Sequence, residues 1–310
     1  MIVLNKDSIL DKSISSYVAL GSFDGIHKGH LTLINKVVDL AKRDGNSSVI
    51  YTFENHPRSV LDKNNSPKML TDNKSKLMLF QDYGLDIVYF EKFDKDFMKL
   101  SPEEFIKYIC DKFKIKGIVV GFNYRFGYKN MGDVELLNNL AKKYNFKLYV
   151  LPPYKCGETV VSSTKIREAI SNGKVEKAKK MLNRAYSLKG KVVCGKQLGR
   201  TMGFPTANLE FEKNILLPKE GVYYTIVMVN NNIYKGITSI GNNPTFSADK
   251  ITVETYILDF ESDIYGINIE VFFEKRIRGM IKFSSMKELK EQLEKDKNFA
   301  RKENSIYNHI

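Results

Sequence analysis

The sequence predicts two domains of different class: a doubly wound, Rossmann-like α/β domain over residues 1–184, and an antiparallel β-barrel domain with a terminal helix over residues 185–310. In the first half, short apolar segments alternate with helical patterns, as in a parallel sheet covered by helices on both faces. From residue 186 to residue 278, apolar side chains recur at every second position and polar turns separate the segments, as in a barrel or a sandwich. A length of 310 residues is sufficient for two hydrophobic cores.

In the first domain, a strand over residues 17–20 should lead into a glycine-rich turn at residues 21–30 and a helix over residues 31–43. Later strands are expected at residues 48–53, 86–90, 117–121 and 147–151. Helices should begin after Thr71, at the Ser101-Pro102-Glu103-Glu104 cap and at Asp133, followed by short helices at residues 163–171 and 175–183. Because ligands bind beyond the carboxyl ends of such strands, residues 21–30, 54–57 and 121–127 should meet at one edge of the sheet.

The second domain should consist of short strands joined by polar turns. Its clearest strand patterns are residues 221–229, 233–240, 251–260 and 267–273. A final helix should begin at Ser285, where Glu288 completes a capping box, and continue to about residue 297.

Composition limits the class of protein. The N-terminus lacks the basic and apolar regions of a signal peptide, and no apolar segment approaches the roughly 20 residues that span a bilayer. Cys110, Cys156 and Cys194 are scattered, which argues against a disulfide framework or a zinc site. We therefore expect a cytoplasmic protein with no membrane partner.

The net charge of +13 has two interpretations. It is compatible with a nucleic-acid-binding protein, but lysine far outnumbers arginine and the lysines are spread along predicted helix faces. We expect a solvated lysine surface and no nucleic-acid partner. The positive field would also favour an anionic small-molecule substrate.

The turn at residues 21–30 gives the first indication of chemistry. Two of the chain's four histidines, His27 and His30, lie three residues apart where this turn enters a helix. Backbone N–H groups at a helix N-terminus bind phosphate, and imidazoles can stabilise charge that develops on an α-phosphate. A tight turn with two surface histidines is the alternative. The pattern predicts a nucleotidyl-transfer site, and the ATP-binding residues expected in the turn are Gly21, Phe23, Gly25 and Gly29.

These residues resemble a known family. His-x-Gly-His marks the nucleotidyltransferase superfamily, and Gly-x-Phe-Asp-Gly-x-His-x-Gly-His is similar to the form found in bacterial bifunctional riboflavin kinase/FMN adenylyltransferases (FAD synthetases). Residues 161–167 resemble the superfamily's second signature, Ser-Ser-Thr-x-Ile-Arg. A helix N-terminus with hydroxyls and two cations suits the phosphates that leave as pyrophosphate, although by itself this segment would be an ordinary serine-capped helix. The residues concerned are Ser163, Thr164, Lys165 and Arg167.

The loop at residues 121–127 combines aromatic rings with a carboxamide. The resemblance implies that this loop borders the flavin and adenine pocket through Asn123, Tyr124 and Phe126, and a loop with an aromatic plug is the alternative. His56, followed by Pro57, matches the family's Thr-Phe-x-x-His-Pro loop, where a purely structural histidine is the alternative. Asp24 either orients the turn or a histidine, or contacts ligand.

In the second half, three glycines and two cations precede the sequence Pro-Thr-Ala-Asn. Thr206 and Asn208 are two residues apart, so on an extended segment they point the same way and offer oxygen ligands to Mg²⁺. The segment matches the riboflavin kinase signature Gly-x-Pro-Thr-Ala-Asn, and a β-turn with a polar rim is the alternative. The glycines and cations suggest a flap over phosphates, formed by Gly195, Lys196, Gly199, Arg200 and Gly203.

Glu254 interrupts a strand that is otherwise rich in apolar residues. The resemblance implies that it is the base that accepts the ribityl 5′-hydroxyl proton as that oxygen attacks the γ-phosphate. A solvent-facing strand position is the alternative. Arg278 lies in another segment that matches the kinase family, which implies a contact with flavin or phosphate.

The resemblance covers essentially the whole chain and implies a two-step enzyme. The second domain would phosphorylate riboflavin to FMN, and the first would convert FMN to FAD with release of pyrophosphate, with ATP as co-substrate and Mg²⁺ as cofactor. Two other hypotheses remain open. One is a flavokinase whose first domain only binds ligand, and the other is a nucleic-acid-binding protein on a nucleotidyltransferase scaffold. The chain departs from the family at Asn130, where a basic residue is expected, and at Asn183 and Ala185 in the linker.

Overall fold

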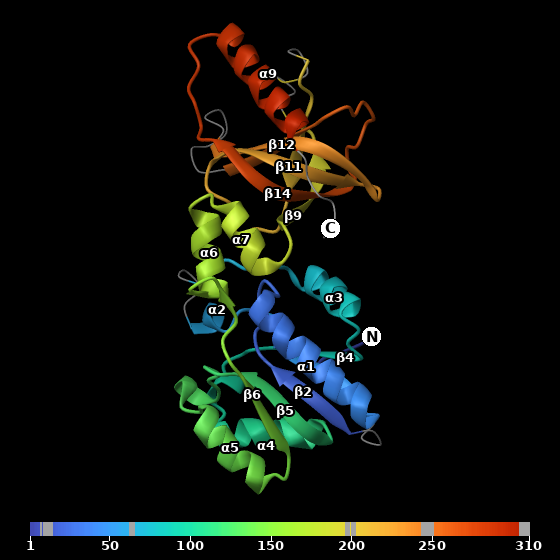
Figure 1. Cartoon of the computed structure of the whole chain (residues 1–310), viewed down its shortest axis with the longest axis vertical. Coiled ribbons are helices and arrows are strands. Elements are labelled where there is room, and N and C mark those ends of the chain that lie inside the picture. The colour runs from blue at the N-terminus through green and yellow to red at the C-terminus, as the bar shows by residue number, and fades with distance from the viewer. Residues whose placement is uncertain are drawn as a thin grey trace. The chain divides into compact units, whose positions relative to one another are not determined.

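A computed structural model of the chain describes residues 1–6, 8, 15–61, 66–195, 199, 203–242 and 251–303. It divides into two compact units, Met1–Ser163 and Thr164–Ile310 (Figure 1). Helices α6 (Ser163–Ser171) and α7 (Val175–Leu182) fall at the start of the second unit, where α7 packs against its strands. The domain boundary that we place after residue 184 stays a prediction. No helix among the described residues is long and apolar enough to cross a membrane.

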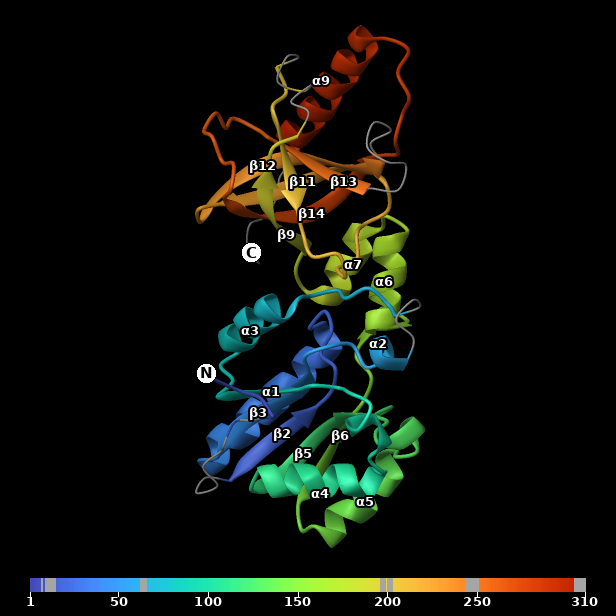
Figure 2. The ribbon, with the colours of Figure 1, turned by 180° about the vertical axis from the view of Figure 1, so that it is seen from behind.

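The first unit contains the predicted parallel sheet, with six strands in the order β1-β4-β3-β2-β5-β6. Figure 2 shows β3, β2, β5 and β6 of this sheet. All five residues of β2 are buried, because this strand has neighbours on both sides and helices on both faces. The short edge strand β1 has no counterpart among the predicted strands. The strands are β1 (Ile2–Leu4), β2 (Ser16–Leu20), β3 (Ser47–Phe53), β4 (Ile87–Glu91), β5 (Ile115–Gly121) and β6 (Lys147–Leu151).

Helices cover both faces of this sheet. Alternate residues of β2 belong to different cores: Ala19 packs with α1 (Lys28–Asp44) and α3 (Asn73–Asp82), and Leu20 packs with α4 (Pro102–Lys112) and α5 (Val134–Lys143). This alternation is the signature of a doubly wound sheet. The predicted cap at Ser101 is confirmed, because Ser101 and Glu104 form a reciprocal capping box at the start of α4. The remaining elements are α2 (Arg58–Leu61), η1 (Phe97–Lys99), η2 (Tyr128–Asn130), β7 (Lys155–Cys156) and β8 (Thr159–Val160).

The second unit contains a closed antiparallel barrel in the order β10-β13-β12-β11-β14-β9, which confirms the predicted β-barrel. Three buried hydroxyls cross its core: Thr238 lies 3.0 Å from Thr225 and 2.9 Å from Thr255. The barrel strands are β9 (Tyr186–Val193), β10 (Thr206–Glu210), β11 (Gly221–Val229), β12 (Asn232–Asn242), β13 (Ile251–Ile257) and β14 (Asn268–Arg278).

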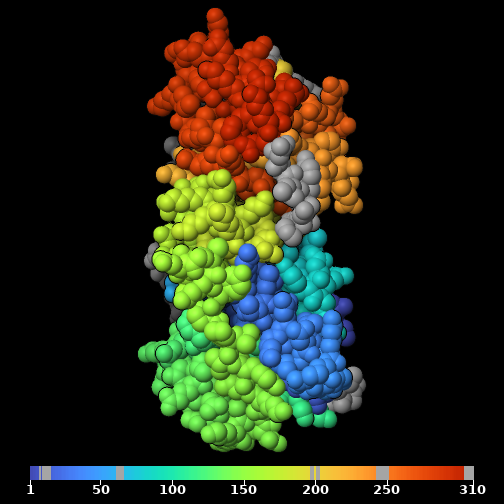
Figure 3. All heavy atoms as spheres, in the orientation of Figure 1, coloured from blue at the N-terminus to red at the C-terminus, as the bar shows by residue number. Residues whose placement is uncertain are grey.

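The terminal helix α9 (Met286–Lys302) packs on the outside of the barrel and forms the red surface in Figure 3. The N-cap of α9 is Ser285, as predicted, and the hydroxyl of Ser285 accepts a hydrogen bond from the N–H of Glu288. The helix is anchored at its other end by the ammonium of Lys235, which donates to the carbonyls of Arg301 and Glu303. A cation at a helix C-terminus is favoured by the helix dipole.

Candidate active sites

The turn that leaves β2 brings both histidines to the N-terminus of α1. His27 is the N-cap of this helix, and its Nδ1 accepts a hydrogen bond from the N–H of His30 at 3.2 Å. The two imidazoles stack with ring centroids 3.7 Å apart and planes 14° apart. The ring of Phe23 lies 5.1 Å from that of His30. Because Nδ1 is the cap acceptor, a neutral His27 carries its proton on Nε2.

Gly29 allows the ring of His27 to pack against the first turn of α1. A Cβ at this position would lie 3.1 Å from Cε1 of His27, which is tighter than most real Cβ contacts. The 17-residue helix directs its positive end and its first N–H groups toward the turn. The turn therefore combines an anion-binding helix end with two stacked imidazoles.

The strand order gives this turn its place in the sheet. From β2 the chain adds β3 and β4 on one side, and β5 and β6 on the other, so the winding reverses between β2 and β5. In open α/β sheets, ligands bind outside the carboxyl ends of the strands at such a reversal. The turn after β2 and the loop after β5 both lie there, which confirms the prediction that they share one edge.

The loop after β5 contributes rings to the core as well as to this edge. Phe126 is buried against Phe105, with ring centroids 5.8 Å apart. Tyr124 stacks on Phe126 at 5.6 Å, and burial raises the pKa of its phenol. Asn123 is exposed. Phe126 is thus a packing residue in this structure, and the flavin contacts of all three residues stay predictions.

Ser163 joins the second signature to the histidine turn. It is the last residue of the first unit, and its hydroxyl donates to the carbonyl oxygen of Asp24 at 2.8 Å. Thr164, Lys165 and Arg167 follow it in α6 and belong to the second unit. The ammonium of Lys165 forms an ion pair with Glu168 at 2.8 Å. The phosphate contacts of these residues stay predictions.

In the barrel, Asn208 and Glu254 lie directly opposite each other on β10 and β13. Glu254 is in turn opposite Ser239 on β12. Opposite residues of antiparallel strands point to the same face, so the carboxamide and the partly buried carboxylate are neighbours. Thr206 is two residues from Asn208 on β10 and shares this face.

Two glycines of the predicted flap, Gly195 and Gly199, lie close to these side chains. A Cβ at Gly195 would lie 2.2 Å from Nδ2 of Asn208, so only glycine fits there without displacement. The carbonyl of Gly199 accepts a hydrogen bond from the N–H of Phe204 at 2.8 Å. Gly203 has a φ of 82°, in the left-handed region. Lys196 and Arg200 lie outside the described residues.

Arg278 is held by α9. Its guanidinium forms an ion pair with Asp296, with Nη2 2.7 Å from the carboxylate and the Asp296 side chain 2% exposed. Arg278 and Glu254 lie on the same row of paired residues across the barrel. Arg278 is opposite Val222 on β11, which is opposite Ser239 on β12, and Ser239 is opposite Glu254 on β13. The contact of Arg278 with flavin or phosphate stays a prediction.

Comparisons with known proteins agree with both halves of this picture. A family model of FAD synthetase matches residues 10–165, and one of riboflavin kinase matches residues 182–304. The chain is 38% identical to a bifunctional riboflavin kinase/FMN adenylyltransferase of Buchnera aphidicola subsp. Schizaphis graminum, over 93% of this chain and 94% of that one. The chain belongs to the bifunctional riboflavin kinase/FMN adenylyltransferase family. The Bacillus subtilis member is 34% identical over 94% of this chain and 93% of its own.

One solved structure shares the fold over nearly the full length of this family member. It is a crystal structure from Streptococcus pneumoniae, named as a macrolide-efflux protein. It is 32% identical, covers 98% of this chain and 100% of its own, and has a TM-score of 0.89. The FAD synthetase match contains His27 and His30, and the riboflavin kinase match contains Asn208 and Glu254. The FAD synthetase half of this bifunctional chain therefore contains the histidine pair, and the riboflavin kinase half contains the pair of Asn208 and Glu254.

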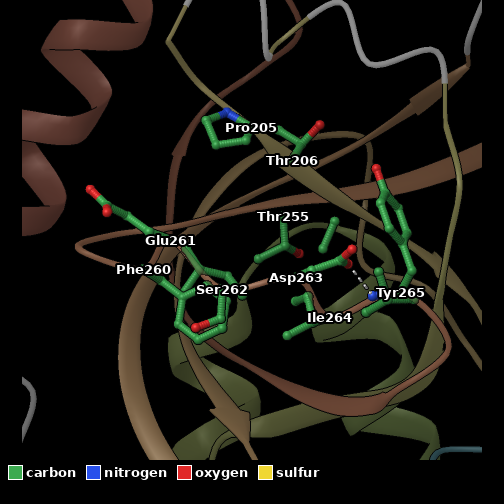
Figure 4. A pocket seen from close by; sticks show the side chains of 12 residues that line it. Pro205, Thr206, Thr255, Phe260, Glu261, Ser262, Asp263, Ile264 and Tyr265 are labelled. Atoms are coloured by element: carbon green, nitrogen blue, oxygen red, sulfur yellow. Dashed lines mark hydrogen bonds between the residues drawn. The ribbon is translucent and has the colours of Figure 1, made fainter.

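The riboflavin kinase half also contains a pocket of about 350 Å³ that no sequence motif predicts. Pro205 and Thr206 lie on one side of it and Phe260 and Ile264 on another (Figure 4). The carboxylate of Asp263 accepts a hydrogen bond from the N–H of Tyr265 at 3.0 Å, which fixes the loop that closes this side. The pocket is invisible in the sequence because its two walls are brought together by the closure of the barrel.

Sequence reasoning missed Asp296, and it left the role of Asp24 open between orienting the turn or a histidine and contacting ligand. Asp296 sits in a polar helix, and nothing in the sequence distinguishes it from the exposed acids around it. Asp24 is recognisable as part of a motif, but the partners of its carboxylate are far along the chain. In both cases the structure supplies the missing information, because a carboxylate that the fold buries must have hydrogen-bond donors around it.

Proposed function

We propose that this chain, which has riboflavin kinase and FMN adenylyltransferase activities, carries out adenylylation at the turn after β2 and phosphorylation on the face of the barrel that holds Glu254. The observation that carries the first assignment is the stacked pair His27 and His30 at the N-terminus of α1. The second assignment is supported by the direct pairing of Asn208 with Glu254.

For adenylylation, an oxygen of the FMN phosphate attacks the α-phosphate of ATP and pyrophosphate leaves. The attacking group is already anionic, so no covalent enzyme intermediate is needed. His27 offers an Nε2–H donor when neutral, and His30 lies beside it, so both can stabilise the charge that develops on the α-phosphate. Ser163, Thr164, Lys165 and Arg167 hold the leaving pyrophosphate in this proposal.

For phosphorylation, the ribityl 5′-hydroxyl of riboflavin attacks the γ-phosphate of ATP, and the carboxylate of Glu254 accepts its proton. The flap of residues 195–203 covers the phosphates. The pocket beside Thr206 takes the adenine of ATP in this proposal, because Phe260 and Ile264 give it an apolar side that suits a flat base and because Thr206, a proposed magnesium ligand, lines it.

A magnesium ion fits the barrel site. Thr206 and Asn208 offer two neutral oxygens on one face, and Mg²⁺ prefers oxygen ligands and keeps few of them from protein when it binds through phosphates. Among the described residues there is no cluster of three or more histidine, cysteine or acidic side chains that could hold a metal by itself. When bound with ATP, the ion would neutralise phosphate charge.

The test separates the two activities in one preparation. Purified protein is incubated with riboflavin, ATP and Mg²⁺, and the flavins are resolved over time. Glu254→Ala should abolish FMN formation while supplied FMN is still converted to FAD. His27→Ala with His30→Ala should accumulate FMN without FAD, because riboflavin phosphorylation does not use these residues.

Each variant is the control for the other. Loss of both activities in either variant would argue against two separate sites, and normal FAD output from the double variant would refute the role of the histidines. A wild-type chain that makes FMN but no FAD would instead support the alternative, a flavokinase whose first domain only binds ligand. No disulfide joins the cysteines among the described residues, and we propose a cytoplasmic location for the protein.

A further inference from the structure

Asp24 lies in the middle of the histidine turn and is 3% exposed. Its Oδ1 accepts hydrogen bonds from the N–H of Leu70 at 3.0 Å and of Thr71 at 3.2 Å. These donors are 46 and 47 residues away in the sequence, in the segment that enters α3. In Figure 2 this coil crosses the end of the sheet where β2 leads into α1. The buried carboxylate therefore ties two distant segments with charge-assisted hydrogen bonds.

The backbone of the turn is held by side chains from other elements. The carbonyl of Asp24 accepts from the hydroxyl of Ser163 at 2.8 Å. The carbonyl of Ser22 accepts from Oγ1 of Thr52 on β3 at 3.0 Å, and from the ammonium of Lys76 on α3 at 3.4 Å. Lys76 is 3% exposed. Hydrogen bonds therefore hold the turn from several segments. The donors are side chains of β3 and α3, the backbone N–H groups before α3, and the hydroxyl of Ser163.

The turn needs this support because its backbone is strained. Phe23 has a φ of 46° and Ile26 a φ of 39°, and both residues are fully buried. Left-handed backbone is unfavourable for residues with a Cβ, most of all for a β-branched one. Such strain persists only where the surrounding structure imposes it, and it occurs preferentially at functional sites. Asp24 lies between the two strained residues, one position after Phe23 and two before Ile26.

We propose that Asp24 is a positioning residue for FMN adenylylation, whose carboxylate holds the strained turn so that His27 and His30 stay stacked at the N-terminus of α1. The inference rests on the proposed role of these histidines. A displacement of about 1 Å at a reacting centre can cost on the order of 100-fold in rate. Loss of the carboxylate should therefore lower kcat for adenylylation, while the affinity for FMN and ATP changes little.

Asp24→Asn is the first test, because it keeps the size of the side chain, removes the charge and replaces one acceptor by a donor. The expected result is a fall of about 10- to 100-fold in kcat for FMN-to-FAD conversion, with both KM values within about 3-fold of wild type. Riboflavin phosphorylation by the same sample should be unchanged. Asp86→Asn is the control for losing a hydrogen-bonded carboxylate elsewhere in the first unit: Asp86 is exposed, and its carboxylate accepts hydrogen bonds from the N–H and hydroxyl of Ser48 near the starts of β3 and β4.

Thr52→Val is the second test, because it removes one hydroxyl donor to Ser22 and keeps the side-chain shape. It should lower kcat for adenylylation by about 3- to 10-fold, and it decides the matter if Asp24→Asn unfolds the first unit. An unchanged kcat in folded Asp24→Asn, or a raised KM with an unchanged kcat, would overturn the proposal. Normal FAD synthesis by the His27→Ala, His30→Ala variant would instead overturn the proposed site itself.

Discussion

Replacing Asp296 by asparagine should destabilise the barrel unit by about 3 kcal/mol. This carboxylate is 1% exposed and accepts hydrogen bonds from Nε and Nη2 of Arg278, at 3.1 and 2.7 Å, and from Gln292 at 2.9 Å. Removing one partner of a buried ion pair costs about 3 to 5 kcal/mol, because the other charge is left without compensation. The lower value applies here, since asparagine keeps one acceptor and the Arg278 side chain is 15% exposed.

The assay is thermal unfolding of the full chain, followed through the transition of the barrel unit. For a unit of this size, about 3 kcal/mol lowers the midpoint by roughly 6 to 12 °C. Asp259→Asn is the matched control, because Asp259 pairs with Arg301 of the same helix at 2.7 Å, the distance of the buried pair. The side chains of Asp259 and Arg301 are both at least half exposed, so losing this ion pair should change the free energy of unfolding by only about 0.5 kcal/mol.

A double replacement tests the reasoning itself. Arg278→Met combined with Asp296→Leu removes both charges, and apolar replacement of a whole buried pair is often neutral. The double variant should therefore recover most of the stability that Asp296→Asn loses. A single variant that melts within about 2 °C of wild type, or a double variant that melts even lower than the single one, would refute the argument from an uncompensated charge.

Two further predictions concern other parts of the chain. Gly195→Ala should lower kcat/KM for riboflavin phosphorylation by about 10-fold or more, because the new Cβ would lie 2.2 Å from Nδ2 of Asn208. FMN adenylylation in the same sample should not change, and equal losses in both reactions would contradict a local effect. Burial raises the pKa of the Cys110 thiol to about 11, so at pH 8 the partly buried Cys110 should react with a disulfide reagent at least about 10-fold more slowly than the exposed Cys194. Comparable rates for the two thiols would contradict the burial of Cys110.

Periodicity and capping were sufficient for most of the fold. The buried strands of the first unit and the cap at Ser101 depend on local patterns, and both are found where the sequence predicts them. The edge strand β1 was missed because three residues, two of them exposed to solvent, are too few to show a period. The predicted barrel is confirmed, but alternation by itself is equally compatible with a sandwich, because the difference lies in the pairing of β9 with both β10 and β14. Strand pairing is a long-range property that alternation does not encode.

The candidate sites divide in the same way. Motif spacing brings His27 next to His30 and Thr206 to the same face as Asn208, since both pairs are a few residues apart on one element. The pairing of Asn208 with Glu254 depends on strand register, and only the family resemblance connected these two residues beforehand. Lys165, expected to bind phosphate, has its ammonium paired with Glu168 in the structure, so ligand would have to compete with that ion pair.

The residues that hold the sites in place are a different class from the residues that face ligand. Asp24 reaches partners 46 and 47 residues away, and Asp296 reaches a partner 18 residues away on another element. In each case a buried carboxylate joins an element that carries a proposed site residue to a neighbouring segment. Their chemistry is fixed by burial, because a desolvated carboxylate without donors would be far too costly to keep. The sequence could therefore single out Asp24 through its motif but not its partners, and Asp296 can be recognised only once the fold shows that it is buried against Arg278.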